Sequence, residues 1–96
     1  MNLEEEYNEE ILIECLSNWA KLGETSNQLL YCIKLDLEAG LSELEERDRL
    51  ALTYYYIEDY NQNEVADRLG ISQQYLSRDI LPNSINKLQK ILKEVG

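Results

Sequence analysis

The stretch "NQNEVADRLGISQQYLSR", residues 61–78, decides the fold of this chain of 96 residues. Two short apolar-periodic segments flank a central glycine, and each follows a residue whose side chain can cap a helix. Asn61 is expected to cap a helix that ends at Leu69, and Ser72 is expected to cap the next helix. Gly70 can take the left-handed conformation that a sharp turn between two helices requires. The pattern is therefore typical of a helix-turn-helix.

Side chains within this motif separate into an apolar side and a polar side. The predicted core of the helix-turn-helix comprises Val65, Ala66, Leu69, Gly70, Ile71 and Leu76. The polar side comprises Gln73, Gln74, Ser77 and Arg78. Side chains of these types can form hydrogen bonds with base edges or phosphates in a major groove. An αα-hairpin with a solvated polar side is the alternative, but the combination of Ala66, Gly70 and Ser72 favours the helix-turn-helix.

The remaining sequence is also predicted to be helical, since it has one proline, four glycines and no sustained alternation of apolar and polar residues. Further helices are expected over residues 3–21, 26–38, 42–57 and 84–94. Gly23 and Gly40 are expected to end the first two of these helices. Ser42 is expected to begin the third in a capping box with Glu45, and Pro82 to interrupt the helix that follows Ser72. The sequence therefore predicts an all-α domain, a small bundle of five or six helices that contains a helix-turn-helix.

Charge divides the chain into two parts. The formal net charge of −10 falls on residues 1–48, which carry thirteen acidic and three basic residues, whereas residues 49–96 carry six of each. We therefore expect an acidic N-terminal helical segment at residues 1–40 and the helix-turn-helix domain at residues 41–96. The apolar face of the first helix is wider than one short neighbour readily covers. It is expected either to pack on the domain's own core or to bind a protein partner or a second copy of the chain.

Composition argues against several functional classes. The chain has no histidine, no glycine-rich phosphate loop and no nucleophile beside a plausible base, so we expect no enzyme activity, no metal site and no cofactor. No apolar run approaches the roughly eighteen residues of a membrane span, and the first residues are acidic, unlike a signal peptide. We expect a cytoplasmic protein without membrane contact. Its two cysteines, Cys15 and Cys32, are expected to be buried thiols, with a disulfide as the less favoured alternative.

Three consecutive tyrosines, Tyr54, Tyr55 and Tyr56, precede the motif. They point to different sides of a helix, so at most two can lie in the core together. A platform on which bases stack, with Tyr60 and Tyr75, is the alternative to packing in the core. No basic residues interleave with the tyrosines, which favours packing in the core.

Residues 41–78, LSELEERDRLALTYYYIEDYNQNEVADRLGISQQYLSR, resemble region 4 of the sigma-70 family of bacterial RNA polymerase sigma factors. The resemblance continues to about residue 93, and ISQQYLSR is most similar to the recognition helix of sporulation-type sigma factors. It implies a non-catalytic transcription regulator that works with RNA polymerase at promoter DNA, as a partial or split sigma factor or as an activator from a phage or mobile element. The alternative is a protein-interaction module that binds RNA polymerase, a sigma factor or another regulator and inhibits it without binding DNA.

The resemblance also implies roles for single residues. The implied DNA-binding residues are Asn61, Gln62, Ser72, Gln73, Gln74, Ser77 and Arg78. Within this set, Asn61 and Gln62 would contact backbone phosphate, and the residues that follow Ser72 would approach the −35 promoter element. One face of residues 41–56 would lie near the part of region 4 that binds the flap of the polymerase β subunit.

The sequence departs from the family pattern in three places. Nothing in residues 1–40 resembles the region that reads the −10 promoter element and melts DNA, so a complete sigma factor is not expected. Pro82 and few cations stand where the family's recognition helix continues as a basic segment. Asp79 occupies an apolar position of the pattern and Ile80 follows one step late, so either the helix is distorted there or its register shifts. Weak DNA affinity is expected from the domain alone, because few phosphates can be neutralised.

Overall fold

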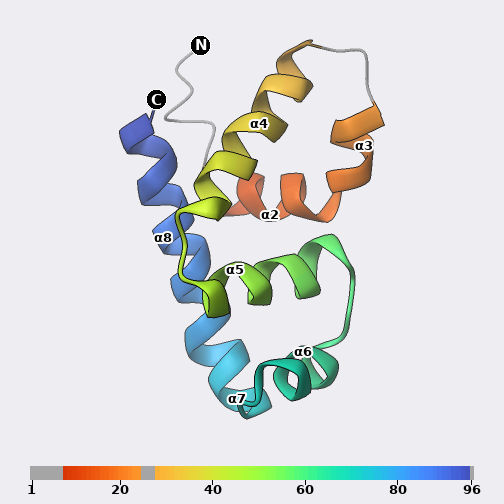
Figure 1. Cartoon of the computed structure of the whole chain (residues 1–96), viewed down its shortest axis with the longest axis vertical. Helices are drawn as coiled ribbons and strands as arrows, with labels where there is room; N and C mark the ends of the chain where they lie inside the picture. The colour runs from red at the N-terminus through yellow and green to blue at the C-terminus, as the bar shows by residue number, and fades with distance from the viewer. Residues whose placement is uncertain (1–7, 25–27, 96) are drawn as a thin grey trace.

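The computed structural model describes residues 8–24 and 28–95. In chain order its elements are α2 (Glu9–Ser17), α3 (Trp19–Glu24), α4 (Gln28–Ser42), α5 (Glu46–Leu52), the π-helix η1 (Thr53–Ile57), α6 (Gln62–Leu69), α7 (Gln73–Tyr75), the π-helix η2 (Leu76–Ile80) and α8 (Leu81–Val95). No strand occurs within these residues, and the predicted all-α bundle is confirmed (Figure 1). None of the helices described is long and apolar enough to cross a membrane.

Helix α8 connects the two ends of the molecule. In Figure 1 it runs along one side, from α7 at the lower end to the C-terminus beside α4. It packs against α5 near the helix-turn-helix and against α2 and α4 at the other end, while α2 also contacts η1. Helix α8 therefore connects the helix-turn-helix to the helices that precede it in the chain.

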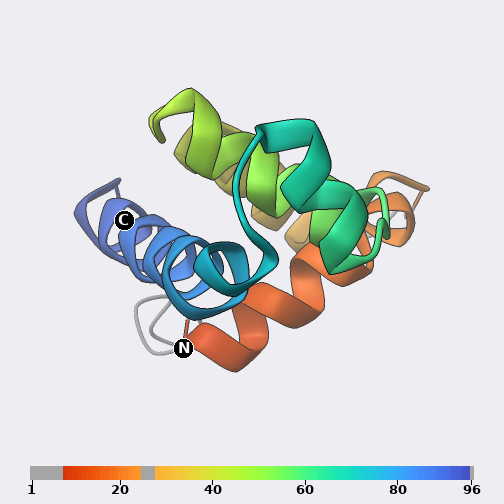
Figure 2. The same ribbon diagram turned by 90° about the horizontal axis from the view of Figure 1, so that it is seen from below.

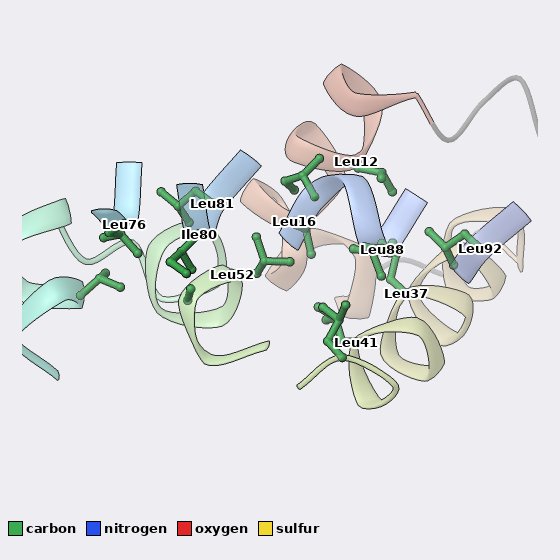
Figure 3. Packing of buried hydrophobic residues seen from close by; sticks show 14 of the residues in the cluster. Leu12, Leu16, Leu37, Leu41, Leu52, Leu76, Ile80, Leu81, Leu88 and Leu92 are labelled. Atoms are coloured by element: carbon green, nitrogen blue, oxygen red, sulfur yellow. The ribbon is translucent and has the colours of Figure 1, made fainter. Parts of the chain in front are cut away.

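Buried leucines from both ends of the chain form one hydrophobic cluster, shown in Figure 3. Leu12 and Leu16 of α2 are fully buried, whereas the neighbouring Ile11 and Cys15 are only half-buried. The apolar face of the first helix therefore buries Leu12 and Leu16, while Cys15 and Trp19 pack against the edge of the cluster.

The predicted first helix is broken at Asn18, which forms a turn between α2 and α3. Its side-chain Nδ2 donates a hydrogen bond of 2.8 Å to the carbonyl of Glu14, a local bond that competes with helix propagation. Helix α2 begins after Asn8, whose Oδ1 accepts from the N–H of Ile11 at 2.9 Å. The prediction that Gly23 ends the first helix is wrong, because α3 continues through it to Glu24.

The prediction that Gly40 ends the second helix is also wrong, because α4 continues to Ser42. Gly40 is buried, and a Cβ added there would lie 2.8 Å from Cδ1 of Leu88 and 3.3 Å from Cδ2 of Leu92. The glycine therefore permits the close approach of α8 to α4. Its position reflects packing between helices and has no capping role.

The predicted capping box at Ser42 is wrong as well. Ser42 is the last residue of α4, and its Oγ donates to the carbonyl of Ala39 at 2.7 Å. Helix α5 begins after Glu45, which forms no side-chain cap. Its first turn carries Glu46 and Asp48, whose negative charges the dipole of an N-terminus stabilises.

A buried ion pair ties α5 to α8. Nζ of Lys87 donates to Oδ2 of Asp48 at 2.9 Å, and the Asp48 side chain is almost fully buried. This hydrogen bond, and then the negative charge of Asp48, raise the pKa of the Lys87 ammonium. The lysine therefore keeps its charge at neutral pH, and the pair links the first turn of α5 to α8.

The π turn η2 explains how Ile80 reaches the core although Asp79 occupies the position at which the family pattern has an apolar residue. The N–H of Leu81 donates to the carbonyl of Leu76, so this turn holds one residue more than an α-helical turn. Ile80 consequently enters the core with 2% of its surface exposed, while Asp79 stays partly exposed. The two alternatives given in the sequence analysis thus coincide, because the distortion of the helix is a π turn that shifts its register by one residue.

Pro82 does not interrupt the helix, contrary to the prediction. Helix α8 begins at Leu81, directly after η2, and runs to Val95. A regular α-helix would bring the proline ring against the carbonyl of Arg78. The wider turn over residues 76–80 removes that arrangement, so the recognition segment and α8 form one continuous helix.

The two cysteines differ in accessibility. Both are free; Cys15 is half-buried and Cys32 is exposed, so the prediction of two buried thiols is wrong for Cys32. Burial, and then the negative charge of Glu14, raise the pKa of the Cys15 thiol. A smaller fraction of Cys15 is therefore in the reactive thiolate form at a given pH.

We therefore expect two phases when the folded protein reacts with an aromatic disulfide reagent at pH 8. The fast phase belongs to the exposed Cys32 and the slow phase to Cys15, and absorbance of the released thiol measures both. Cys32→Ser should remove the fast phase and leave the slow one. A single phase in the parent, or loss of the fast phase in Cys15→Ser, would contradict this assignment.

Candidate nucleic-acid interface

The helix-turn-helix begins at a well-formed cap. Oδ1 of Asn61 accepts from the N–H of Glu64 at 2.9 Å, and Nδ2 of Asn61 donates to Oε1 of Glu64 at 2.6 Å. This reciprocal pair satisfies an unpaired N–H group at the start of α6. The prediction that Asn61 caps a helix ending at Leu69 is confirmed.

Gly70 makes the turn of the motif. Its φ is 70° and its ψ is 33°, the left-handed region. The N–H of Ile71 reaches back to the carbonyl of Ala66 at 3.0 Å, as in a Schellman motif. A Cβ at position 70 would meet no atom within 4 Å, so only the backbone conformation calls for glycine there.

Ser72 then caps α7, the second helix of the motif. Its Oγ accepts from the N–H of Tyr75 at 3.1 Å, which confirms the predicted cap. The helix continues from α7 through η2 into α8. Figure 2 views the molecule from this end, where a turn leads from α6 into the start of the continuous helix.

The structure places most of the sequence-predicted DNA-binding residues on the surface. The exposed members are Asn61, Ser72, Gln73, Gln74, Ser77 and Arg78, and Gln62 is half-buried. Nε2 of Gln73 lies 3.4 Å from Oε1 of Gln62, which brings the first residues of α6 and α7 together. The geometry thus joins a segment predicted to contact phosphate and a segment predicted to contact bases in one polar surface.

Beneath this surface, the apolar residues of the motif face inward. Val65, Ala66 and Leu76 are buried, while Leu69 and Ile71 are partly buried and pack against the main cluster. The prediction that Gly70 lies in the core is wrong, because the turn it forms is exposed. This packing fixes the angle between α6 and α7, and so the direction in which the polar side chains of α7 project.

Two residues at this surface are absent from the sequence-predicted set. Tyr75 of α7 is 38% exposed, between Gln74 and Ser77 in the sequence. The guanidinium of Arg47, from the first turn of α5, lies 5.8 Å from the centroid of its ring. Arg47 and Tyr75 are far apart in sequence, so no local pattern could have associated them.

Arginines on this side of the molecule are partly engaged within the chain. Nε of Arg78 lies 3.6 Å from Oδ2 of Asp79, although the Arg78 side chain is 76% exposed. Nε of Arg47 lies 3.6 Å from Oδ1 of Asp48. The guanidinium of Arg68 stacks 4.4 Å from the ring centroid of Tyr60. These contacts reduce the positive charge available to phosphates.

No group of three or more Cys, Asp or Glu side chains within the described ranges is arranged to hold a metal ion. The site therefore consists of polar and cationic side chains on a helical scaffold. Such an arrangement can form hydrogen bonds with a nucleic acid or another polar surface.

Comparison with known proteins places this scaffold in a family. The family model "Sigma-70, region 4" matches residues 40–90, a range that includes α5, the helix-turn-helix and most of α8. The chain is 49% identical over 45 residues to the RNA polymerase sigma-F factor of Bacillus subtilis (strain 168), covering 47% of this chain and 18% of that protein. It is 43% identical over 58 residues to the RNA polymerase sigma-F factor of Priestia megaterium, covering 60% of this chain and 22% of that protein.

These matches concern one part of longer proteins, since the chain spans about a fifth of the length of the curated relatives it matches. No solved structure matches the chain. The matched range contains the capped α6, the left-handed turn at Gly70 and the capped α7 described above. The chain belongs to the sigma-70 region 4 family.

Proposed function

We propose that this chain is a non-catalytic transcription regulator that acts with RNA polymerase at promoter DNA. The observation that carries the proposal is the polar surface of α7 and η2, which follow the Gly70 turn and the Ser72 cap and on which Gln73, Gln74 and Arg78 are exposed. Side chains of this kind on a recognition helix can read base edges in a major groove. Membership of the sigma-70 region 4 family supports a −35-like element as the target.

RNA polymerase is the proposed protein partner, and residues 41–56 supply the contact to the β flap. On this segment Glu45, Glu46 and Arg47 are exposed, whereas Leu52 is buried in the core. A partner that holds the domain near promoter DNA would also offset its shortage of cations, because tethering raises the local concentration. We propose that the chain acts as a partial or split sigma factor or as an activator from a phage or mobile element.

Arg78→Ala is the direct test of the recognition surface. DNA is first selected from a random pool by the full chain with core polymerase, and the affinity of the variant for the selected DNA is then measured. We expect a loss of about fivefold or more, confined to selected sequences if Arg78 contacts a base and uniform across sequences if it contacts phosphate.

Lys93→Ala is the matched control, because it removes one exposed cation from the far end of the same continuous helix. Its affinity should stay near that of the parent. Equal affinities of Arg78→Ala, Lys93→Ala and the parent, with circular dichroism showing all three folded, would reject α7 as the reading surface.

The alternative is a module that binds RNA polymerase or another regulator and inhibits it without contacting DNA. The engagement of Arg47, Arg68 and Arg78 by neighbouring side chains favours it, as does the net charge of −10. The same selection distinguishes the two functions. Polymerase binding without enrichment of any DNA sequence would support the inhibitor.

A further inference from the structure

A hollow of about 510 Å³ lies between the end of α2 and the segment that joins η1 to α6. Three tyrosines, Tyr55, Tyr56 and Tyr60, line it together with one carboxylate, Asp59. Its volume falls in the range of small-molecule sites, about 300–1,000 Å³. The DNA-binding proposal assigns no role to this hollow.

The tyrosines present ring faces in different directions. Tyr55 and Tyr56 meet edge to face, with centroids 4.8 Å apart and ring planes at 70°. The face of an aromatic ring carries partial negative charge and attracts cations. One such cation is already bound beside the hollow. The guanidinium of Arg68 stacks on the ring of Tyr60 and lies 5.5 Å from the ring centroid of Tyr54. Arg68 itself does not line the hollow.

Asp59 gives the hollow its charge. Its carboxylate forms no hydrogen bond or ion pair with any side chain in residues 8–24 or 28–95, and the neighbouring Glu58 is also exposed and acidic. Asp59 has a φ of 60°, a left-handed conformation that aspartate and asparagine adopt more readily than most residues other than glycine. The π-helix η1 ends at Ile57, two residues before Asp59, and single π turns occur frequently at functional sites.

The Tyr56 hydroxyl stays protonated. Burial raises its pKa above the ordinary value of a tyrosine, and the neighbouring Tyr55 and then Glu9 add to the effect. The hollow is therefore lined by one carboxyl group, that of Asp59, and by three phenol rings, of which that of Tyr56 is held in its neutral form by burial.

We propose that this hollow binds a small organic ammonium ion, with Asp59 as the counter-charge and the rings of Tyr55, Tyr56 and Tyr60 as its walls. Alkylammonium ions are weakly hydrated and gain from aromatic faces, whereas a Ca²⁺ or Mg²⁺ ion needs several oxygen ligands in place of one carboxylate. An anion would be repelled by Asp59 and by the net charge of −10. Asn61 borders both the hollow and the cap of α6, so the bound ion lies next to the start of the helix-turn-helix.

Choline and its uncharged carbon analogue, 3,3-dimethylbutan-1-ol, make a matched pair of probes for the full chain. Each is titrated at constant ionic strength while the tyrosine ring signals are followed by NMR. We expect saturable shifts of a subset of ring signals with choline, and binding of the alcohol weaker by about fivefold or more. Absence of saturable shifts with choline, or equal binding of the two probes, would overturn the proposal.

Two variants locate the site. Asp59→Asn removes the charge, and asparagine tolerates the left-handed conformation at this position, so choline affinity should fall about fivefold or more with the fold unchanged. Asp67→Asn removes an exposed carboxylate of α6 outside the hollow and should leave affinity unchanged. Tyr55→Leu, which removes one wall, should also weaken choline binding. Equal effects of the two aspartate variants, or no effect of Asp59→Asn and Tyr55→Leu, would show that choline binds elsewhere.

Discussion

Replacement of Leu88 by alanine is expected to lower the free energy of unfolding by about 2–5 kcal/mol, the usual effect of truncating a buried leucine. Leu88 is fully buried in the cluster where α8 meets the N-terminal helices, and its Cδ1 faces Gly40 of α4. A loss of this size is a large share of the roughly 5–15 kcal/mol that holds a typical domain folded. Urea unfolding followed by circular dichroism measures it.

Lys90→Ala is the matched control, because it truncates an exposed side chain of the same helix and should change stability by less than about 0.5 kcal/mol. Gly40→Ala tests the contact itself. In the Leu88→Ala background the new methyl no longer meets Cδ1 of Leu88, so it should restore about 1 kcal/mol through helix propensity. In the parent the same change should be less favourable. Equal effects in both backgrounds would contradict the close approach of α4 and α8.

Gly70→Val is expected to destabilise the domain by about 1–3 kcal/mol, since a β-branched residue resists the left-handed conformation. A Cβ at this position would meet no atom within 4 Å, so the expected cost is assigned to the backbone conformation. Thermal unfolding monitored by circular dichroism measures the change.

Gly70→Asn separates conformation from side-chain size. Asparagine has a side chain about as large as that of valine, yet it tolerates a φ of 70°. Gly70→Asn should therefore destabilise the domain less than Gly70→Val. If the two variants melt at the same temperature as the parent, the turn does not depend on the left-handed conformation.

Features fixed by neighbouring residues could be predicted from the sequence. The caps at Asn61 and Ser72 and the turn at Gly70 depend on bonds spanning a few residues, and all three are present as expected. At these three positions the effect of a side-chain oxygen near a free N–H, or of a residue without a Cβ, does not depend on a distant contact.

Features fixed by distant residues could not be predicted in this way. Gly40 resembles a helix end in isolation, but it lies inside α4 because Leu88 and Leu92 of α8 need the space. Asp79 and Pro82 suggest a break, but a π turn absorbs the extra residue and keeps Ile80 in the core. Sequence periodicity assumes a constant number of residues per turn, so it cannot indicate where the turn widens.

Among the site residues, the sequence could nominate polar side chains after Ser72 but not their partners. The contact of Arg47 with Tyr75 and the bond of Gln73 to Gln62 arise only when α5, α6 and α7 are assembled. Such contacts decide which donors and cations are free, and they depend on the angle at which the helices cross.

The uninterrupted path from Gln73 to Val95 has a mechanical consequence. A helix of this length is roughly 35 Å long and bends far less readily than a loop. Its lower end carries the recognition residues, and its upper end is held by α2 and α4. The orientation of the polar side chains on α7 and η2 is therefore coupled to the packing of α8 against α2 and α4 at the opposite end of the same helix.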